Sequence, residues 1–358
     1  MSSENAPHLL VVDGDARRGR RPEQPEAFLR GAPWPGTRSV PYPRVNPVDR
    51  MRVPGDTWQM ATIPVGVRLE FAGDARAVEV AYRTDTDQLG YRGDAAGVTF
   101  SSWTASGKVG DVAASLGDGT VTIPLDSSAP RTIVHVPEGM KPWILSVDGL
   151  DGDLLPAPAE PRWVVYGDSV AEGWIASEPA MAWPAIAGRE QGLDHVNLGY
   201  AGAARGETAS AEQVAKLEAD VITVCHGTNC WTRTPHSVAQ MVANTETFLH
   251  ILRQDHPTTP IVVASPVVRP DAESTPNRLG ATLAELRMAM EWVAQDFIDR
   301  GDARLSLVPG LGLITAEQLG DGIHPDDGGH TAMAAAIGRA ARGAFDEALA
   351  ADLDDGRP

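Results

Sequence analysis

The sequence predicts an antiparallel β-sandwich followed by an α/β domain, and three observations lead to this fold class. Short runs of strand-forming residues recur between about residues 57 and 150. After residue 161, strand-like segments alternate with helical ones. A Pro-rich segment, DGDLLPAPAEP at 151–161, separates the two patterns. A chain of 358 residues is also too long for one typical core, so two domains are expected.

The first half is expected to be an irregular N-terminal arm, 1–55, and a β-sandwich domain, 56–155. The arm is rich in Pro, Gly and Arg and shows little periodicity. In the following region, β-like runs are bounded by Gly, Asp, Pro or Ser, and several alternate apolar with polar residues. This spacing is typical of an antiparallel sandwich or jelly roll. The runs are VGVRLEF, AVEVAYRT, GVTFSSWT, GTVTIPL, RTIVHV and PWILSV.

The second half is expected to be an α/β domain at 156–350, followed by an acidic tail at 351–358. Its strand-like runs are WVVYG, HVNLG, DVITVCHG, PIVVASPV and RLSLVPG. A helix is clear at 237–254, where apolar residues recur at three- and four-residue steps. Strands that alternate with helices imply a mostly parallel sheet with helices on both faces. Ligands of such sheets bind beyond the carboxyl ends of the strands.

Composition excludes several classes of function. The formal net charge of −18 argues against a nucleic-acid partner and against anionic lipid, since both require a basic surface. No apolar run is long enough to span a membrane, and the N-terminus does not read as a secretory signal. The two cysteines, Cys225 and Cys230, show no metal-binding pattern and are interpreted as reduced. A cytoplasmic location is therefore expected.

Four stretches carry residues suited to chemistry. WVVYGDSVAEGW places Ser169 directly after a strand, and NLGYAGAARGE places Gly202 in a loop with three glycines. Asn229 follows the next strand in HGTNCW. In DGIHPDDGGH, Asp321 precedes His324 by three residues, just before the last helix. The glycine spacing is not G-x-G-x-x-G, so a dinucleotide site is not expected.

With these four blocks in this order, residues 161–347 resemble the GDSL/SGNH hydrolase superfamily of serine esterases and acylhydrolases. The resemblance implies a three-layer α/β/α flavodoxin-like domain without a cofactor. It implies that Ser169 is the nucleophile, His324 the base and Asp321 the acidic partner of that base. It also implies an oxyanion hole formed by the backbone N–H groups of Ser169 and Gly202 and the side-chain amide of Asn229.

The sequence departs from the family pattern at two positions. Val170 stands where the name motif has Leu, and Cys230 stands where the third block usually has Asp. The preceding β-domain resembles, by its layout alone, the jelly roll of two-domain carbohydrate esterases of this superfamily.

The chemistry needs these residue types because a serine hydroxyl is a poor nucleophile until a base takes its proton. Histidine suits that task, and an acidic partner fixes its tautomer. We therefore expect hydrolysis of a short-chain acyl ester, such as acetyl, of a polar or carbohydrate-like alcohol through an acyl-enzyme. One alternative is acyl transfer to a second small molecule. Another is a carbohydrate-binding protein with a silent site. The expected partner is a small-molecule ester.

Plainer interpretations exist for the same residues. Asp168 or Ser169 can cap the following helix, and His324 can be a structural histidine. A further alternative is a metal cluster formed by Asp321, His324, Asp326, Asp327 and His330. However, Asp326 and Asp327 occupy the expected N-cap of the last helix, and His330 falls in its first turns, so no metal is expected. The indoles that flank these loops can line a substrate cleft or pack in the core, with Trp174 and Trp231 preferred for the cleft over Trp183.

Overall fold

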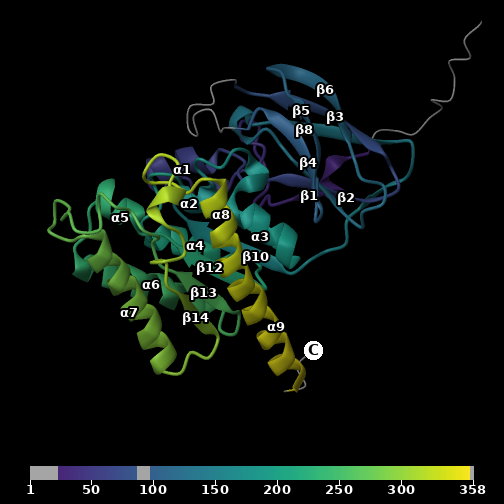
Figure 1. Ribbon diagram of the computed structural model, residues 1–358. Helices are drawn as coiled ribbons and strands as arrows, with labels where there is room; N and C mark the ends of the chain where they lie inside the picture. The colour runs from purple at the N-terminus through teal and green to yellow at the C-terminus, as the bar shows by residue number, and fades with distance from the viewer. Residues whose placement is uncertain (1–22, 87–96, 355–358) are drawn as a thin grey trace, which may run out of the picture.

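The computed structural model describes residues 23–86 and 97–354 (Figure 1). The first 22 residues of the expected arm and residues 355–358 of the expected tail lie outside this part of the chain. The last helix, α9 (Arg339–Asp354), contains the first four residues of the expected tail. No helix among the described residues is long and apolar enough to cross a membrane.

Two antiparallel sheets form a sandwich from the first half of the chain, as predicted. One sheet has the order β1 (Leu29–Arg30), β2 (Arg68–Gly73), β7 (Thr132–His135), β4 (Thr99–Thr104) and β5 (Gly107–Ala113), with β9 (Leu154–Pro156) also beside β2. The other has the order β6 (Gly117–Pro124), β3 (Ala77–Thr84) and β8 (Trp143–Leu150). Alternate residues of β3 are buried, and Val78, Val80 and Tyr82 pack against Phe71 and Phe100 of the facing sheet. This alternation is the pattern that the sequence carries.

The structure corrects the expected arm and joint. Phe28 belongs to the sandwich core and Val45 to the core of the α/β part, so the N-terminal segment is built into both. A helix that was not predicted, α1 (Gly55–Ala61), crosses the expected boundary at residue 55. The Pro-rich joint contributes β9, whose Leu154 pairs with Gly73. Strand β5 was also not predicted, because its GKVGDVA sequence has little β propensity.

The second half forms a parallel sheet between two helical layers (Figure 1). The strand order is β11 (Asp194–Gly199), β10 (Arg162–Gly167), β12 (Val221–Cys225), β13 (Ile261–Ala264) and β14 (Leu305–Val308). Every pair in this sheet is parallel. The order second, first, third, fourth, fifth is that of flavodoxin-like folds. The fold class predicted from the sequence is therefore confirmed.

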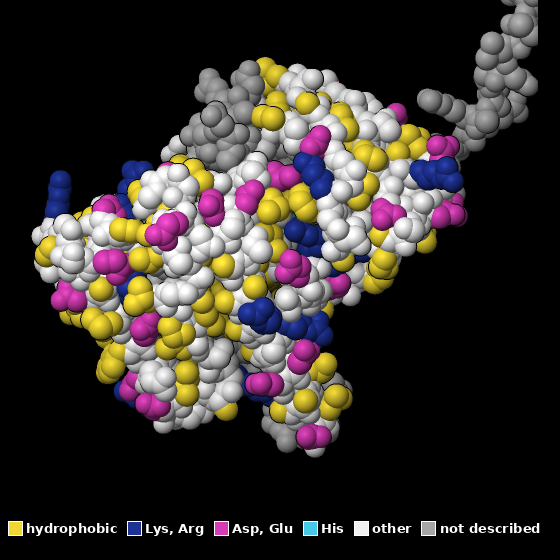
Figure 2. Space-filling model, viewed as in Figure 1, with side chains coloured by type: hydrophobic (Ala, Val, Ile, Leu, Met, Phe, Trp, Pro, Cys, Tyr) yellow, Lys and Arg dark blue, Asp and Glu magenta, His cyan; other side chains and the backbone are white. Residues whose placement is uncertain are grey.

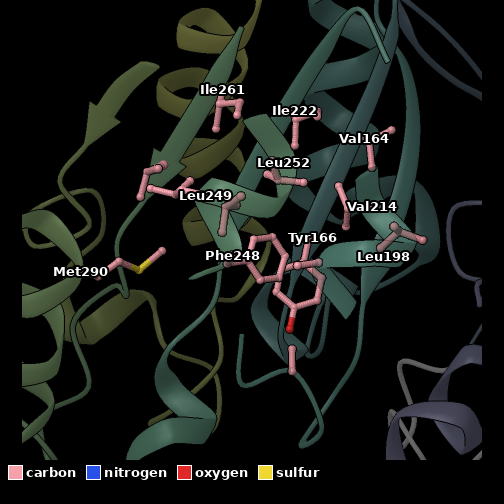
Figure 3. Packing of buried hydrophobic residues seen from close by; sticks show 14 of the residues in the cluster. Val164, Tyr166, Leu198, Val214, Ile222, Phe248, Leu249, Leu252, Ile261 and Met290 are labelled. Carbon is pink, nitrogen blue, oxygen red and sulfur yellow. The ribbon is translucent and has the colours of Figure 1, made fainter. Parts of the chain in front are cut away.

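The two faces of the sheet carry separate apolar cores. Val164 and Tyr166 of β10 point to the core that includes α4 (Thr208–Ala215), α6 (Val238–Asp255) and α7 (Leu283–Asp299), part of which is shown in Figure 3. Trp163 and Val165 point to the core with α3 (Trp183–Gln191), α8 (Asp327–Met333) and α9. A strand buried on both faces explains the continuous apolar run WVVY.

The helix predicted at 237–254 is α6, which begins after a capping box formed by Ser237 and Gln240. Of the residues that recur at three- and four-residue steps, five are buried and Val242 is partly buried. The five are Met241, Thr245, Phe248, Leu249 and Leu252. Val238, in the first turn, is 41% exposed.

The register of the sheet brings the loops with the chemistry-bearing residues to one edge. Gly167, the last residue of β10, lies beside Gly199 of β11 and beside Cys225 of β12. A Cβ atom on Gly199 would lie 2.4 Å from the backbone nitrogen of Glu172, so glycine permits the chain after β10 to turn directly over β11. The segments that follow these three strands therefore emerge together.

Candidate active site

Ser169 begins a short helix, α2 (Ser169–Glu172), directly after β10. Asp168 is its N-cap, and the carboxylate accepts hydrogen bonds from the N–H groups of Val170 at 3.0 Å and Thr228 at 3.2 Å. Burial raises the pKa of Asp168, against the effect of these hydrogen bonds. The capping role thus belongs to Asp168, which also ties the Ser169 turn to the Thr228 loop. Ser169 itself is 5% exposed.

His324 and Asp321 lie in line with Ser169. The Ser169 Oγ atom is 2.9 Å from Nε2 of His324, and Nδ1 of the same ring is 2.7 Å from Oδ2 of Asp321. The other Asp321 oxygen accepts hydrogen bonds from the backbone N–H groups of Ile323 and His324. Because a carboxylate only accepts, Nδ1 donates to Asp321, and the neutral ring presents the Nε2 lone pair to the serine hydroxyl.

Two opposing effects act on the Asp321 carboxylate. Burial tends to raise its pKa, but the hydrogen bonds from the His324 ring and backbone outweigh burial and hold the pKa below its ordinary value. Asp321 is therefore ionised near neutral pH, as a partner of the imidazole N–H must be.

The other acidic and histidine side chains near this loop have structural partners. Asp326 caps α8 by accepting from the Gly329 N–H, and Asp327 accepts from the Ser177 N–H, both at 2.8 Å. His330 is fully buried, with Nδ1 accepting from the Trp183 N–H and Nε2 beside the Trp174 carbonyl at 3.1 Å. Among residues 23–86 and 97–354, no group of three or more His, Cys, Asp or Glu is placed to hold a metal ion.

The glycine and asparagine of the second and third blocks lie beside the serine. Gly202 has a left-handed backbone with φ of +69°, and its loop is held where the Ala201 N–H donates to Glu172 at 2.8 Å. Asn229 is the second residue of α5 (Thr228–Thr232) and is buried. One N–H of its amide donates to the Ala204 carbonyl at 3.2 Å, which leaves the second N–H for a ligand.

A cavity of about 200 Å³ joins these groups. It is lined by Ser169, Gly202, Asn229 and His324, while Asp321 lies behind the histidine ring. Trp174 also lines the cavity, and its ring packs on His324 with centroids 5.1 Å apart. The structure thus brings together the residues that the sequence analysis selected from four separate blocks.

The prediction for Trp231 is corrected. This residue does not line the cavity. Its indole N–H donates to the Thr275 carbonyl at 2.8 Å, and its ring lies under the Arg269 guanidinium at 4.9 Å. Trp183 is fully buried in the core beside Trp163.

The cavity is also lined by two arginines, Arg233 and Arg269, which the sequence analysis did not select. Arg233 lies four residues after Asn229 and caps α5, so both occupy one face of that helix. The i, i+4 spacing was available in the sequence, but no helix was predicted in this segment. Arg269 follows β13 and is buried, and no local pattern in the sequence distinguishes it from the other arginines.

Comparison with known proteins places this chain in an enzyme family. Residues 160–342, just over half of the chain, match the family model described as GDSL-like Lipase/Acylhydrolase family. The chain therefore belongs to this family, and it is a serine hydrolase acting on carboxylic esters. A comparison with curated proteins gave no match.

Solved structures share both parts of the fold. A salicylyl-acyltransferase, SsfX3, from a tetracycline biosynthetic pathway has a TM-score of 0.74 at 23% identity, over 88% of this chain and 94% of that one. A protein described as a GDSL-like lipase from Bacteroides ovatus has a TM-score of 0.72 at 21% identity, over 89% and 96%. A family two carbohydrate esterase from Clostridium thermocellum has a TM-score of 0.55 at 16% identity, over 76% and 90%.

Proposed function

We propose that the protein hydrolyses a short-chain acyl ester of a polar or carbohydrate-like alcohol through an acyl-enzyme on Ser169. The observation that carries this proposal is a series of two hydrogen bonds at the wall of a cavity. The first joins Ser169 Oγ to His324 at 2.9 Å, and the second joins His324 to Asp321 at 2.7 Å. These are the distances that proton transfer between a nucleophile and its base requires.

In the first half of the reaction, the Ser169 oxygen attacks the ester carbonyl while Nε2 of His324 takes the hydroxyl proton. Asp321 holds the ring and stabilises the imidazolium that forms. The negative charge on the former carbonyl oxygen accepts hydrogen bonds from the Ser169 and Gly202 N–H groups and from the free amide N–H of Asn229. The C–O bond to the alcohol then breaks, and His324 returns its proton to the departing oxygen.

In the second half, water replaces the alcohol. His324 takes a proton from water as the water oxygen attacks the acyl carbon, and the same donors stabilise the second oxyanion. Cleavage of the bond to Ser169 releases the carboxylic acid, and the serine recovers its proton from His324. An acceptor hydroxyl in place of water gives acyl transfer with the same residues.

The cavity supports a small acyl group and a polar alcohol. Its volume of about 200 Å³ is small, and its wall combines the Trp174 ring with Thr228, Thr232 and two arginines. Planar rings bind the apolar faces of cyclic molecules, and hydroxyl and guanidinium groups bind their polar edges. A carbohydrate esterase with the same two-part fold agrees with this class of substrate.

Labelling with a fluorophosphonate tests the nucleophile. We expect one adduct, at Ser169, and loss of roughly 10⁴- to 10⁶-fold of turnover in Ser169→Ala with unchanged circular dichroism. Ser177→Ala, at an exposed serine close to the site, is the matched control and is expected to behave as the wild type. Labelling at another serine, or activity in Ser169→Ala, would contradict the proposal.

Product analysis separates the remaining alternatives. Incubation of an acetyl ester with candidate alcohol or amine acceptors is expected to give acetate rather than an acetylated acceptor. Complete conversion to the acetylated acceptor would establish acyl transfer. A protein that takes up no fluorophosphonate at all would be a binding protein with a silent site.

A further inference from the structure

The side chain of Arg233 lies beside Gly202, whose N–H is a proposed oxyanion donor, at the wall of the same cavity. Its backbone N–H donates to the Asn229 carbonyl at 3.0 Å, so the two residues lie one helical turn apart. A Cβ atom placed on Gly202 would lie 3.4 Å from Nε and 3.7 Å from the central guanidinium carbon of Arg233. The guanidinium therefore lies beside Gly202, at the wall of the cavity that Ser169 also lines.

Arg233 makes no ion pair or side-chain hydrogen bond with any residue in the described part of the chain. Neighbouring arginines differ in this respect. Arg269 is bound by both oxygens of Asp271, at 2.8 and 3.0 Å, and Arg205 is bound by Asp56 and Glu207. An arginine left without a carboxylate at a cavity is available for an anion on a ligand.

The local charge of the cavity is opposite to that of the whole chain. The chain carries 48 acidic and 30 basic residues, and acidic side chains are spread over the face seen in Figure 2. Among the described residues that line the cavity there are two arginines and His324, and no Asp or Glu. The cavity lining therefore favours an anionic ligand although the chain as a whole carries a net negative charge.

We propose that Arg233 binds a carboxylate on the alcohol part of the substrate, so that the enzyme acts on esters of a hydroxy acid. This inference rests on the proposed function, because it places the anion beside the ester that Ser169 attacks. The small cavity leaves the acyl group short, which assigns the anion to the alcohol. The planar guanidinium matches a carboxylate with two parallel hydrogen bonds, whereas Arg269 is already paired with Asp271.

A matched pair of substrates tests the proposal: the acetyl esters of 4-hydroxybenzoate and of 4-hydroxybenzamide, which differ in charge but hardly in shape. The quantity compared is the ratio of kcat/KM for the anionic ester to that for the neutral ester. We expect Arg233→Gln to lower this ratio roughly 10-fold, since a hydrogen-bonded charged pair contributes about that factor. Arg233→Lys is expected to be intermediate, because the charge remains without the planar geometry.

Arg278→Gln is the control, since this exposed arginine lies outside the cavity beside Asn277, which donates to the Cys230 and His236 carbonyls. It removes the same charge and is expected to keep the wild-type ratio. An equal fall in both variants would show a general charge effect and overturn the role of Arg233. An unchanged ratio in Arg233→Gln, with both esters still hydrolysed, would also overturn it and leave the proposed function intact.

A second measurement does not require turnover. We expect 4-hydroxybenzoate to protect Ser169 from the fluorophosphonate at a lower concentration than 4-hydroxybenzamide does, and this difference is expected to disappear in Arg233→Gln. Equal protection by the two compounds in the wild type would refute the carboxylate site. Absence of any label on Ser169 would instead refute the proposed function, and this inference with it.

Discussion

The buried ion pair between Arg44 and Glu172 joins the N-terminal segment to the turn that carries Ser169. The two side chains are fully buried, with the guanidinium 3.7 Å from the carboxylate. The Glu172 carboxylate also accepts from the Ala201 N–H, and Arg44 donates to the carbonyl of Gly199 at the end of β11. A segment expected to be an irregular arm therefore positions both the serine turn and the loop with Gly202.

Removal of Arg44 is expected to destabilise the protein strongly. Arg44→Met leaves the Glu172 carboxylate buried without its cation, which typically costs about 3–5 kcal/mol of the free energy of unfolding. Arg52→Met is the control, because Arg52 is 51% exposed and its solvent-screened ion pairs with Asp49 and Glu212 are expected to contribute little to stability. Urea unfolding of both variants measures the difference.

The double variant Arg44→Met, Glu172→Gln checks the cause. It removes the uncompensated charge and is expected to recover part of the lost stability. Equal losses of unfolding free energy in Arg44→Met and Arg52→Met would show that the buried Arg44–Glu172 pair matters no more to stability than an exposed pair.

The sequence allowed the prediction of those features that repeat or that lie in local motifs. Alternating apolar residues identified β3, and continuous apolar runs identified the strands of the parallel sheet. Ser169 and His324 stood out because each belongs to a short motif next to a predicted element. Their contact across the sheet edge follows from the parallel order of the strands, which the βαβ pattern implies.

Features that depend on contacts distant in sequence were missed. Arg44 is 128 residues from Glu172, and nothing near Arg44 in the sequence marks it as buried. Strand β9 forms in a Pro-rich segment because β2 offers an unpaired edge to it. Arg233 was not selected because its position at the cavity depends on α5, a helix too short to show periodicity.

Substitution of His324 is expected to lower kcat more than substitution of Asp321. His324→Ala removes the base and should lower kcat by a factor similar to that of Ser169→Ala. Asp321→Asn should retain more activity, because the imidazole still reaches Ser169 and the loss of the orienting acid alone usually costs less. Steady-state kinetics on an acetyl ester measure both variants.

Asp326→Asn and Asp327→Asn serve as controls, since these side chains bind backbone N–H groups of α8 and of Ser177. They are expected to change stability by about 1 kcal/mol at most and to leave kcat near the wild-type value. If Asp321→Asn kept full activity while Asp326→Asn was inactive, the assignment of Asp321 as the acidic partner of His324 would be wrong.

Asn229 is expected to act in the transition state. Its free amide N–H faces the cavity and should bind charge that exists only after attack. Removal of one such donor typically lowers kcat by about 10²- to 10³-fold. Asn229→Ala should therefore lower kcat by that factor with little change in KM. An unchanged kcat with a raised KM would instead indicate ground-state binding.

The carboxylate of Asp49 is expected to make stability depend on pH. Hydrogen bonds from Lys216 and Gln213, opposed by burial, lower its pKa from the ordinary 3.8 to about 2. A carboxylate whose pKa is lower in the folded than in the unfolded chain stabilises the fold when the pH lies above the unfolded-state pKa. For a shift of this size the contribution is about 2 kcal/mol. The contribution is complete above about pH 4 and is lost as the pH falls towards about 2.

Asp49→Asn tests this linkage, because it imitates the protonated side chain. The difference in unfolding free energy between wild type and variant should be largest near neutral pH and vanish near pH 2. Urea unfolding at a series of pH values measures it. Asp118→Asn, at an exposed carboxylate paired with Arg83, is the control and should show a smaller, salt-sensitive difference. A constant Asp49→Asn difference at every pH would contradict the prediction.

Acyl chain length is expected to limit activity steeply. The cavity of about 200 Å³ is lined by Trp174 and Ile323 among others, and its small volume leaves little space for the acyl group and the alcohol together. Each methylene that does not fit should change kcat/KM by roughly 10-fold or more. Aryl esters from acetyl to dodecanoyl should therefore show a maximum between acetyl and butyryl. Ile323→Ala widens the cavity beside His324 and should move that maximum to longer chains, whereas a wild-type maximum at eight carbons or more would rule out the small acyl site.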